Sequence, residues 1–247
     1  MQTRALLAQA NVESRMMLRR REVIFFSILL PAMFMFLFGS IFGNQQDPSG
    51  VRIVNYMLPG YMVMAVMSVA FISLGIMTAN ERHNGVLKRL GATPLPRALL
   101  LLGKMAAIVL VIVAAIVVLL IIGVSMYGVE IKGSPLDIAL ALLLGIGVFA
   151  IIGLMVGGMV KAEAAPAILN AVYFPLLFLG GALLPLSQLP DWLQQLAKLL
   201  PSYHFTNTLI AVMVNGQPLT DAWGHLLALA AWGLVALAVA SRTFKWE

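Results

Sequence analysis

NERHNGVLKRLGATPLPR, residues 80–97, is the longest charge-rich stretch that lies between two long apolar runs of the chain. Its titratable and proline residues are Glu81, Arg82, His83, Lys88, Arg89, Pro94, Pro96 and Arg97. Each flanking run is long enough for a membrane-spanning helix, which needs roughly 20 apolar residues. We therefore predict that this charged island (residues 80–97) is a loop where a membrane-embedded protein meets the aqueous phase.

The composition also indicates a membrane protein. Of the 247 residues, 61% are hydrophobic and only 11% are charged, whereas soluble domains carry about 25% charged residues. The net charge of +6 could suggest a nucleic-acid partner. In a membrane protein, however, basic residues serve as topology signals, so we expect no nucleic acid. The absence of cysteine excludes disulfides, thiolate metal sites and a cysteine nucleophile.

Six apolar runs predict an all-α polytopic fold in a single transmembrane domain, residues 1–247. The predicted spans are residues 23–43, 54–79, 98–127, 136–160, 164–184 and 221–240. Lys104 is the only charge within the third span, and we expect its side chain to snorkel back to the headgroups. Gly153 and Gly157 have the small-residue spacing that lets helices pack closely. We interpret the aromatic residues of the spans as lipid-packing or helix-packing residues, among them Phe34, Phe36, Phe38, Tyr173, Phe174 and Phe178.

Two segments outside the spans have helical periodicity. Residues 1–22 are basic and predict either an amphipathic helix on the cytosolic membrane surface or a plain basic leader that sets topology. Residues 185–220 contain two short apolar patterns separated by prolines, and neither is long enough to span. We expect them to be interfacial or re-entrant helices between the last two spans. An ordinary amphipathic loop helix is the alternative.

Lysine and arginine positions predict the orientation. With six spans and the N-terminus inside, only Arg52, Lys132 and Lys198 of the 16 basic residues fall on the outer side. The positive-inside rule therefore predicts a multi-pass protein of a bacterial-type inner (plasma) membrane, with both termini in the cytoplasm. It also places the charged island in the cytoplasm and residues 185–220 outside.

The chain shows no energy source or catalytic site of its own. It has no G-x-x-x-x-G-K-[ST] motif for nucleotide phosphates, and its spans are almost free of the ionisable residues that ion-driven transporters use. His83, His204 and His225 lack metal-site spacing. We therefore predict that the chain is not an enzyme and holds no metal or cofactor, and that a separate motor drives it.

The charged island has the pattern of a short helix followed by a stiff exit. Residues 80–90 can form the helix, with Gly91 as its terminating residue. The residue before Pro94 avoids the α region, so the chain leaves in an extended form. Such an element can act as a lever, because a partner that grips it would move both adjoining spans. The alternative is a simple basic loop with a proline turn.

The string E-R-x-x-G-x-L-K-R-L-x-A-T-P-L, from Glu81 to Leu95, resembles the cytosolic loop of type-2 ATP-binding-cassette (ABC) exporter permeases of the drug and antibiotic-resistance branch. That loop commonly reads E-R-E-x-G-T-L-E/K-x-L-x-x-T-P. The matching positions are Glu81, Arg82, Gly85, Leu87, Leu90, Thr93 and Pro94. His83 and Val86 depart from the pattern. The region from Gly180 to Pro201 also resembles the segment after the fifth span in this family.

The resemblance implies roles for three groups of residues. Coupling to a nucleotide-binding ATPase subunit would involve Glu81, Arg82, Gly85, Leu87, Lys88, Arg89, Leu90, Thr93 and Pro94. The interfacial N-terminal helix would use Arg15, Arg19, Arg20 and Arg21. An outer gate would contain Pro185, Pro190, Trp192, Leu196 and Pro201. The resemblance also implies a second permease subunit, identical or paralogous, with ATP and magnesium bound by the ATPase partner.

The leading hypothesis is a permease that exports a hydrophobic or amphipathic compound, such as a drug, an antibiotic or a lipid-like molecule, from the cytoplasm or inner leaflet. Export of a polysaccharide or lipid-linked glycan is the alternative within transport. A non-transporting membrane scaffold or sensor subunit is an alternative of a different class, and a membrane-embedded enzyme is a third.

Overall fold

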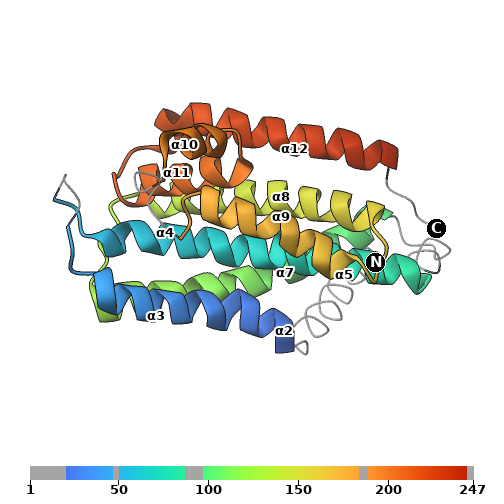
Figure 1. Ribbon diagram of the computed structural model, residues 1–247, viewed down its shortest axis with the longest axis horizontal. Coiled ribbons are helices and arrows are strands. Elements are labelled where there is room, and N and C mark those ends of the chain that lie inside the picture. Colours follow the sequence, from blue (N-terminus) through green and yellow to red (C-terminus); the bar gives the residue numbers. More distant parts are fainter. Residues whose placement is uncertain (1–20, 47–49, 87–88, 90–96, 184–188, 244–247) are drawn as a thin grey trace.

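The computed structural model describes residues 21–46, 50–86, 89, 97–183 and 189–243, and its regular elements are helices (Figure 1). In chain order they are α2 (Arg21–Ile24), η1 (Phe25–Leu29), α3 (Leu30–Phe42), α4 (Ile53–Val66), η2 (Met67–Ser73), α5 (Leu74–His83), α7 (Arg97–Ile121), η3 (Ile122–Met126), α8 (Pro135–Met159), α9 (Ala165–Leu179), α10 (Asp191–Ala197), α11 (Pro201–Met213), η5 (Leu219–Ala222) and α12 (Trp223–Thr243). The segments η1, η2 and η3 are π-helical, and η5 is a 3₁₀ turn.

Five helical stretches are long and apolar enough to cross a membrane. They are Phe25–Phe42, Ile53–His83, Leu102–Met126, Pro135–Met159 and Leu219–Thr243. These stretches coincide with five of the six predicted spans and confirm an all-helical, multi-pass membrane fold. The remaining predicted span, residues 164–184, is helical only in α9.

Helix α9 is shorter than the sequence suggests. Its 15 residues give a length of about 22 Å at 1.5 Å per residue, less than the roughly 30 Å hydrocarbon core of a bilayer. The helix ends because Gly180 and Gly181 follow it, and Gly181 has a φ of +73°, which side-chain-bearing residues rarely adopt. Apolar residues continue beyond this point, so composition alone gave no sign of the break.

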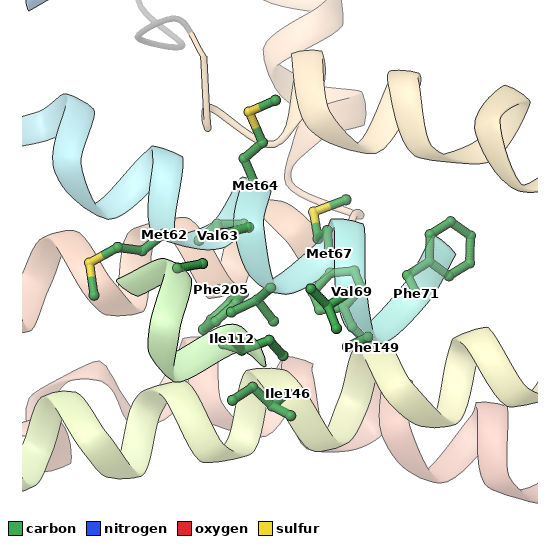
Figure 2. Packing of buried hydrophobic residues seen from close by; sticks show 14 of the residues in the cluster. Met62, Val63, Met64, Met67, Val69, Phe71, Ile112, Ile146, Phe149 and Phe205 are labelled. Carbon is green, nitrogen blue, oxygen red and sulfur yellow. The ribbon is translucent and has the colours of Figure 1, made fainter. Parts of the chain in front are cut away.

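The continuous helix formed by α4, η2 and α5 lies at the centre of the bundle (Figure 1). In its most apolar part, 83% of the residues are buried, whereas only 17% are buried in the corresponding part of the stretch that contains α12. Figure 2 shows buried side chains of this helix beside residues of α7, α8 and α11, namely Ile112, Ile146, Phe149 and Phe205. A displacement of the central helix must therefore move the helices packed around it, because buried side chains leave no free volume between them.

Glycines let α8 approach the central helix closely. A β-carbon at Gly157 would lie 2.3 Å from the carbonyl oxygen of Gly75, and one at Gly153 would lie 2.6 Å from that of Ala70. Both distances are too short for any side chain. The predicted close-packing face at Gly153 and Gly157 is thus confirmed, with α5 and η2 as its partners.

The second short helix of the 185–220 segment, α11, lies inside the bundle. It packs against α4, α8, α9 and α12, and Phe205 and Leu209 are fully buried. The ring of Phe205 occupies the space beside Gly145 of α8, where a β-carbon would lie 2.2 Å from it. Helix α11 is therefore an inner element of the fold and not an amphipathic loop helix on the surface.

Candidate functional site

Glu81 and Lys104 form an ion pair between the last turn of α5 and the beginning of α7. The Lys104 Nζ donates a hydrogen bond to the Oε2 of Glu81. Only 5% of the lysine side chain and 13% of the glutamate side chain are exposed. The expectation that Lys104 snorkels to the headgroups is therefore wrong. An ammonium group buried among helices needs a charged partner, and the end of the preceding span supplies one.

Arg82, the next residue, binds the end of α8. Its Nη2 donates to the carbonyl oxygen of Val160 at 2.6 Å, and its Nη1 donates to that of Gly158. Helix α8 ends at Met159, so these carbonyls are among the last ones, which lack partners within the helix. A guanidinium group here also interacts favourably with the negative end of the helix dipole. Arg82 thus caps α8 from α5.

Replacement of Arg82 with lysine should destabilise the fold. Lysine keeps the charge but lacks the planar fork that donates to two carbonyl groups at once. We expect the free energy of unfolding to fall by about 1.5–3 kcal/mol, the scale of one lost charged hydrogen bond. Thermal unfolding in detergent would measure this as a lower apparent Tm. Arg89→Lys is the matched control, because Arg89 is exposed. Equal stability of both variants would contradict the capping role.

The chain turns directly after Glu81 and Arg82. Helix α5 ends at His83, and Gly85 has a φ of +65° with nothing within 4 Å of a β-carbon. The positive φ favours glycine here, whereas a side chain at this position would meet no neighbouring atom. The structure differs from the expected short helix over residues 80–90, because the second span itself continues to His83 and the break falls at Asn84 and Gly85.

Around this turn, His83, Asn84 and Arg89 are the exposed residues among those of the island whose burial the structure describes. Arg89 is exposed and donates from Nη2 to the Asn84 carbonyl oxygen at 3.1 Å. His83 Nε2 lies 3.9 Å from Glu163 Oε1, in the turn between α8 and α9. Both side chains are more than half exposed, so this contact contributes little. The side chains available to a partner are thus those near the turn, while Glu81 and Arg82 are bound within the chain.

Other predicted coupling residues lie outside the described residues. They are Leu87, Lys88, Leu90, Thr93 and Pro94, together with Arg15, Arg19 and Arg20 of the N-terminal segment. Arg21 is the first residue of α2. Their roles stay predictions.

A second candidate site is a groove of about 450 Å³ between the first span, the second span and the shorter helix α9. It is bounded by α2, η1 and α3 on one side, by α4, η2 and α5 on another, and by α9. The lining residues are Val23, Phe26, Leu30, Phe34, Met64, Ser68, Ile72, Ser73, Ile76, Pro166, Asn170, Tyr173, Phe174, Leu177, Phe178 and Leu183. Phe34, Tyr173, Phe174 and Phe178 were interpreted from sequence as packing residues, but the structure places them on this groove.

The groove is aromatic, uncharged and only sparsely polar. Ser68 donates to the Met64 carbonyl oxygen at 2.9 Å, so the Tyr173 hydroxyl, 2.9 Å away, donates to Ser68 Oγ. Ser73 donates to the Ser68 carbonyl oxygen at 2.9 Å. Asn170 donates to the Pro166 carbonyl oxygen at 2.7 Å. These donors are used within the chain, so the groove suits an apolar or amphipathic ligand of drug size, for which pockets of roughly 300–1,000 Å³ are usual.

The groove is also bordered by irregular helix. Two π-helical segments, η1 and η2, contribute lining residues. In η2 the Leu74 amide donates to the Val69 carbonyl oxygen, five residues back. Because π-helical turns inside α-helices occur frequently at functional sites and hinges, the second span has a point beside the groove where its geometry can change.

The predicted outer-gate residues divide between an exposed and a buried helix. Pro190 precedes α10, on which Trp192 is 64% exposed and Leu196 is 48% exposed. Pro201 begins α11 and is buried. Pro185 lies outside the described residues. The exposed apolar side chains of α10 and the buried helix α11 thus form two distinct parts of the predicted gate.

Two contacts that the sequence did not predict hold this segment to α12. His204 Nδ1 and His225 Nδ1 lie 3.0 Å apart and share a hydrogen bond. Trp232 Nε1 donates to the Leu199 carbonyl oxygen at 3.0 Å. The residues of each contact are far apart in the sequence, so no local motif could reveal them. Within the described ranges, no cluster of three or more His, Asp or Glu residues is placed to hold a metal ion.

Comparison with known proteins assigns the bundle to a family. Residues 49–242 match the sequence model of the family described as "ABC-2 family transporter protein", and this match covers the island, the central helix and α12 up to Arg242. The chain belongs to the ABC-2 family. It is thus a transmembrane permease subunit and not the ATPase. ABC-2 permeases pair with ATPase subunits, which hydrolyse the ATP.

Several relatives of the ABC-2 permease are similar along much of its length. A putative transport permease of Bacillus subtilis (strain 168), YvfS, is 26% identical over 227 residues, covering 91% of this chain and 90% of the relative. The daunorubicin resistance permease protein DrrB1 of Streptomyces coeruleorubidus is 25% identical over 217 residues, covering 85% and 74%. A probable multidrug permease of Escherichia coli (strain K12), YbhS, is 24% identical over 169 residues, covering 66% of this chain but 44% of the relative.

Proposed function

We propose that this ABC-2 permease exports a hydrophobic or amphipathic, drug-sized compound from the cytoplasm or inner leaflet across a bacterial-type inner membrane. The observation that carries this proposal is the groove between the first span, the second span and helix α9. It has five aromatic side chains and no charged one among its lining residues, which favours a compact apolar ligand over a polar polymer such as a polysaccharide. Two of the relatives are named for multidrug transport and daunorubicin resistance.

The motor in this proposal is an ATPase subunit bound at the charged island on the cytosolic side. The bias of lysine and arginine toward that side supports the orientation. The exposed residues His83, Asn84 and Arg89 support a docking surface there. A second permease subunit, identical or paralogous, would complete the transport path, with one ATPase subunit for each permease.

The test is purification of the tagged chain from its own host in mild detergent, followed by reconstitution into vesicles. We expect a stoichiometric ATPase subunit to copurify, and the vesicles to accumulate daunorubicin only when ATP is present. Recovery of the chain with its ATPase but without daunorubicin transport would contradict the proposed ligand class. Recovery of the chain alone, with no ATP-dependent transport, would support the scaffold alternative.

Arg89→Glu should weaken the docking of the ATPase. The substitution reverses a charge on the exposed face of the island, where electrostatic complementarity governs association. We expect the amount of copurified ATPase to fall several-fold, on the order of the tenfold change that one close charge pair can produce. The control is Lys132→Glu, the same reversal at an exposed site at the opposite end of the bundle. An equal loss in both variants would mean that net charge, and not the island, governs recovery.

A further inference from the structure

The end of the second span is tied to both neighbouring spans by consecutive residues. Glu81 binds Lys104 of α7, and Arg82 binds the last carbonyl groups of α8. Both attachments lie within one turn of the point where the chain leaves α5 for the charged island. The island itself returns to the bundle at Arg97, where α7 begins. The Glu81–Lys104 pair therefore joins the two helices from which the island extends.

This ion pair is not explained by stability. The free energy needed to remove two charges from water is about as large as the free energy that their attraction supplies. A buried ion pair therefore rarely stabilises a protein more than two apolar side chains of similar size. The flanking residues of α7 are almost all apolar, and an apolar pair would fit the surroundings. What a charged pair provides in addition is a directional contact, since an ammonium group and a carboxylate hold one mutual geometry.

We propose that the Glu81–Lys104 ion pair is a clamp that makes the adjoining ends of α5 and α7 move as one unit. Glu81 and Lys104 are then positioning residues, which touch neither the ATPase nor the exported compound. This proposal rests on the proposed function. It assigns Glu81 a role different from the direct ATPase contact that the sequence motif suggests, because its side chain is buried against α7.

The clamp determines whether a displacement of the island is transmitted to the central helix. When the clamp is closed, a push on the island cannot separate α5 from α7, so it displaces the whole central helix. That helix continues without a break into η2, which borders the groove through Ser68 and Ser73. When the clamp is open, the same push can separate α5 from α7, and the central helix is displaced less. The ATPase would then still dock and hydrolyse ATP, but the groove would not respond.

A cysteine in the groove can measure this response without knowledge of the exported compound. The chain has no cysteine, so Ser73→Cys adds a single reactive thiol at the groove. The rate of its labelling with N-ethylmaleimide would be compared in the permease–ATPase complex with and without ATP and vanadate. In the otherwise unchanged chain, we expect trapping of the ATPase to change this rate by about tenfold, within the usual range of allosteric coupling.

The decisive variants change the pair without leaving a lone buried charge. Glu81→Leu and Lys104→Met together replace both charges with apolar side chains of similar size, so the thermal stability of this variant should be close to that of the unchanged chain. We expect the ATPase to copurify in normal amount, while the effect of trapping on the labelling rate disappears. The exchange of Glu81→Lys with Lys104→Glu should restore at least half of the effect. Glu163→Gln, an exposed change at the same end of the bundle, should leave it intact.

Each result distinguishes the clamp from simpler explanations. If the doubly neutral variant keeps the full change in labelling rate, the ion pair is only structural and the clamp is wrong. A second contradicting result is that the doubly neutral variant loses the change in labelling rate, while the exchanged pair, Glu81→Lys with Lys104→Glu, forms a stable complex and does not restore it. That result would also contradict the clamp, because the exchanged pair keeps the ionic contact between α5 and α7. If no ATPase copurifies with the unchanged chain, the proposed function fails first, and the clamp fails with it. Loss of daunorubicin transport alone does not affect the labelling experiment.

Discussion

Replacing Gly157 with leucine should sharply reduce the amount of correctly assembled permease. A β-carbon at this position would lie 2.3 Å from the Gly75 carbonyl oxygen, 3.0 Å from its carbonyl carbon and 3.0 Å from its α-carbon. All three are backbone atoms of α5, so no side-chain rotation can relieve the clash. Helices α5 and α8 would have to separate, and overpacking of this kind costs about 3 kcal/mol or more. Because a typical domain is stable by only about 5–15 kcal/mol, this cost removes a large part of the stability, and we expect the yield of folded protein to fall several-fold.

The measurement is the amount of monodisperse protein that elutes after extraction of a fluorescent fusion in mild detergent. Gly147→Leu is the matched control, because it makes the same change on the same helix where nothing lies within 4 Å of the β-carbon. We expect its elution profile to match that of the unchanged chain. Similar profiles for Gly157→Leu and Gly147→Leu would show that the close contact between α5 and α8 is not required for folding.

The close packing at Gly157 was also one of the few tertiary features that the sequence predicted. Spacing along one helix shows which residues share a face, and small residues four apart indicate that a partner helix can approach there. The span positions were predictable for a similar reason, because a membrane requires an uninterrupted apolar run of a fixed minimum length. These signals are local, so they do not depend on how the helices are arranged.

Features that depend on the arrangement of helices were missed. Lys104 was assigned to the headgroups, since its distance from the span end allowed snorkelling, whereas its partner Glu81 comes from another helix. A lysine in an otherwise apolar span needs a carboxylate partner, and Glu81 is the nearest acidic residue before Lys104 in the sequence. That signal was present but not used. The groove had no comparable signal, because its aromatic residues resemble those that face lipid.

Filling the groove should stop transport without preventing folding. Asn170 lies on α9, is only partly buried and lines the groove, so Asn170→Trp adds a large side chain there. Its amide donates only to Pro166 of the same helix, and loss of that local bond should not break the bundle. We expect ATP-dependent daunorubicin accumulation to fall on the order of tenfold or more, because the added ring excludes the ligand. Copurification of the ATPase should be unchanged.

Two further variants identify the cause of this loss. Ile168→Trp places the same ring on α9 at a residue that is 40% exposed and does not line the groove, so transport should continue. Asn170→Leu keeps the size of the side chain but removes its polar group. If Asn170→Leu transports normally while Asn170→Trp does not, the groove acts through its volume. If Ile168→Trp fails and Asn170→Trp transports, the compound passes along the other face of α9, and the groove is not part of the path.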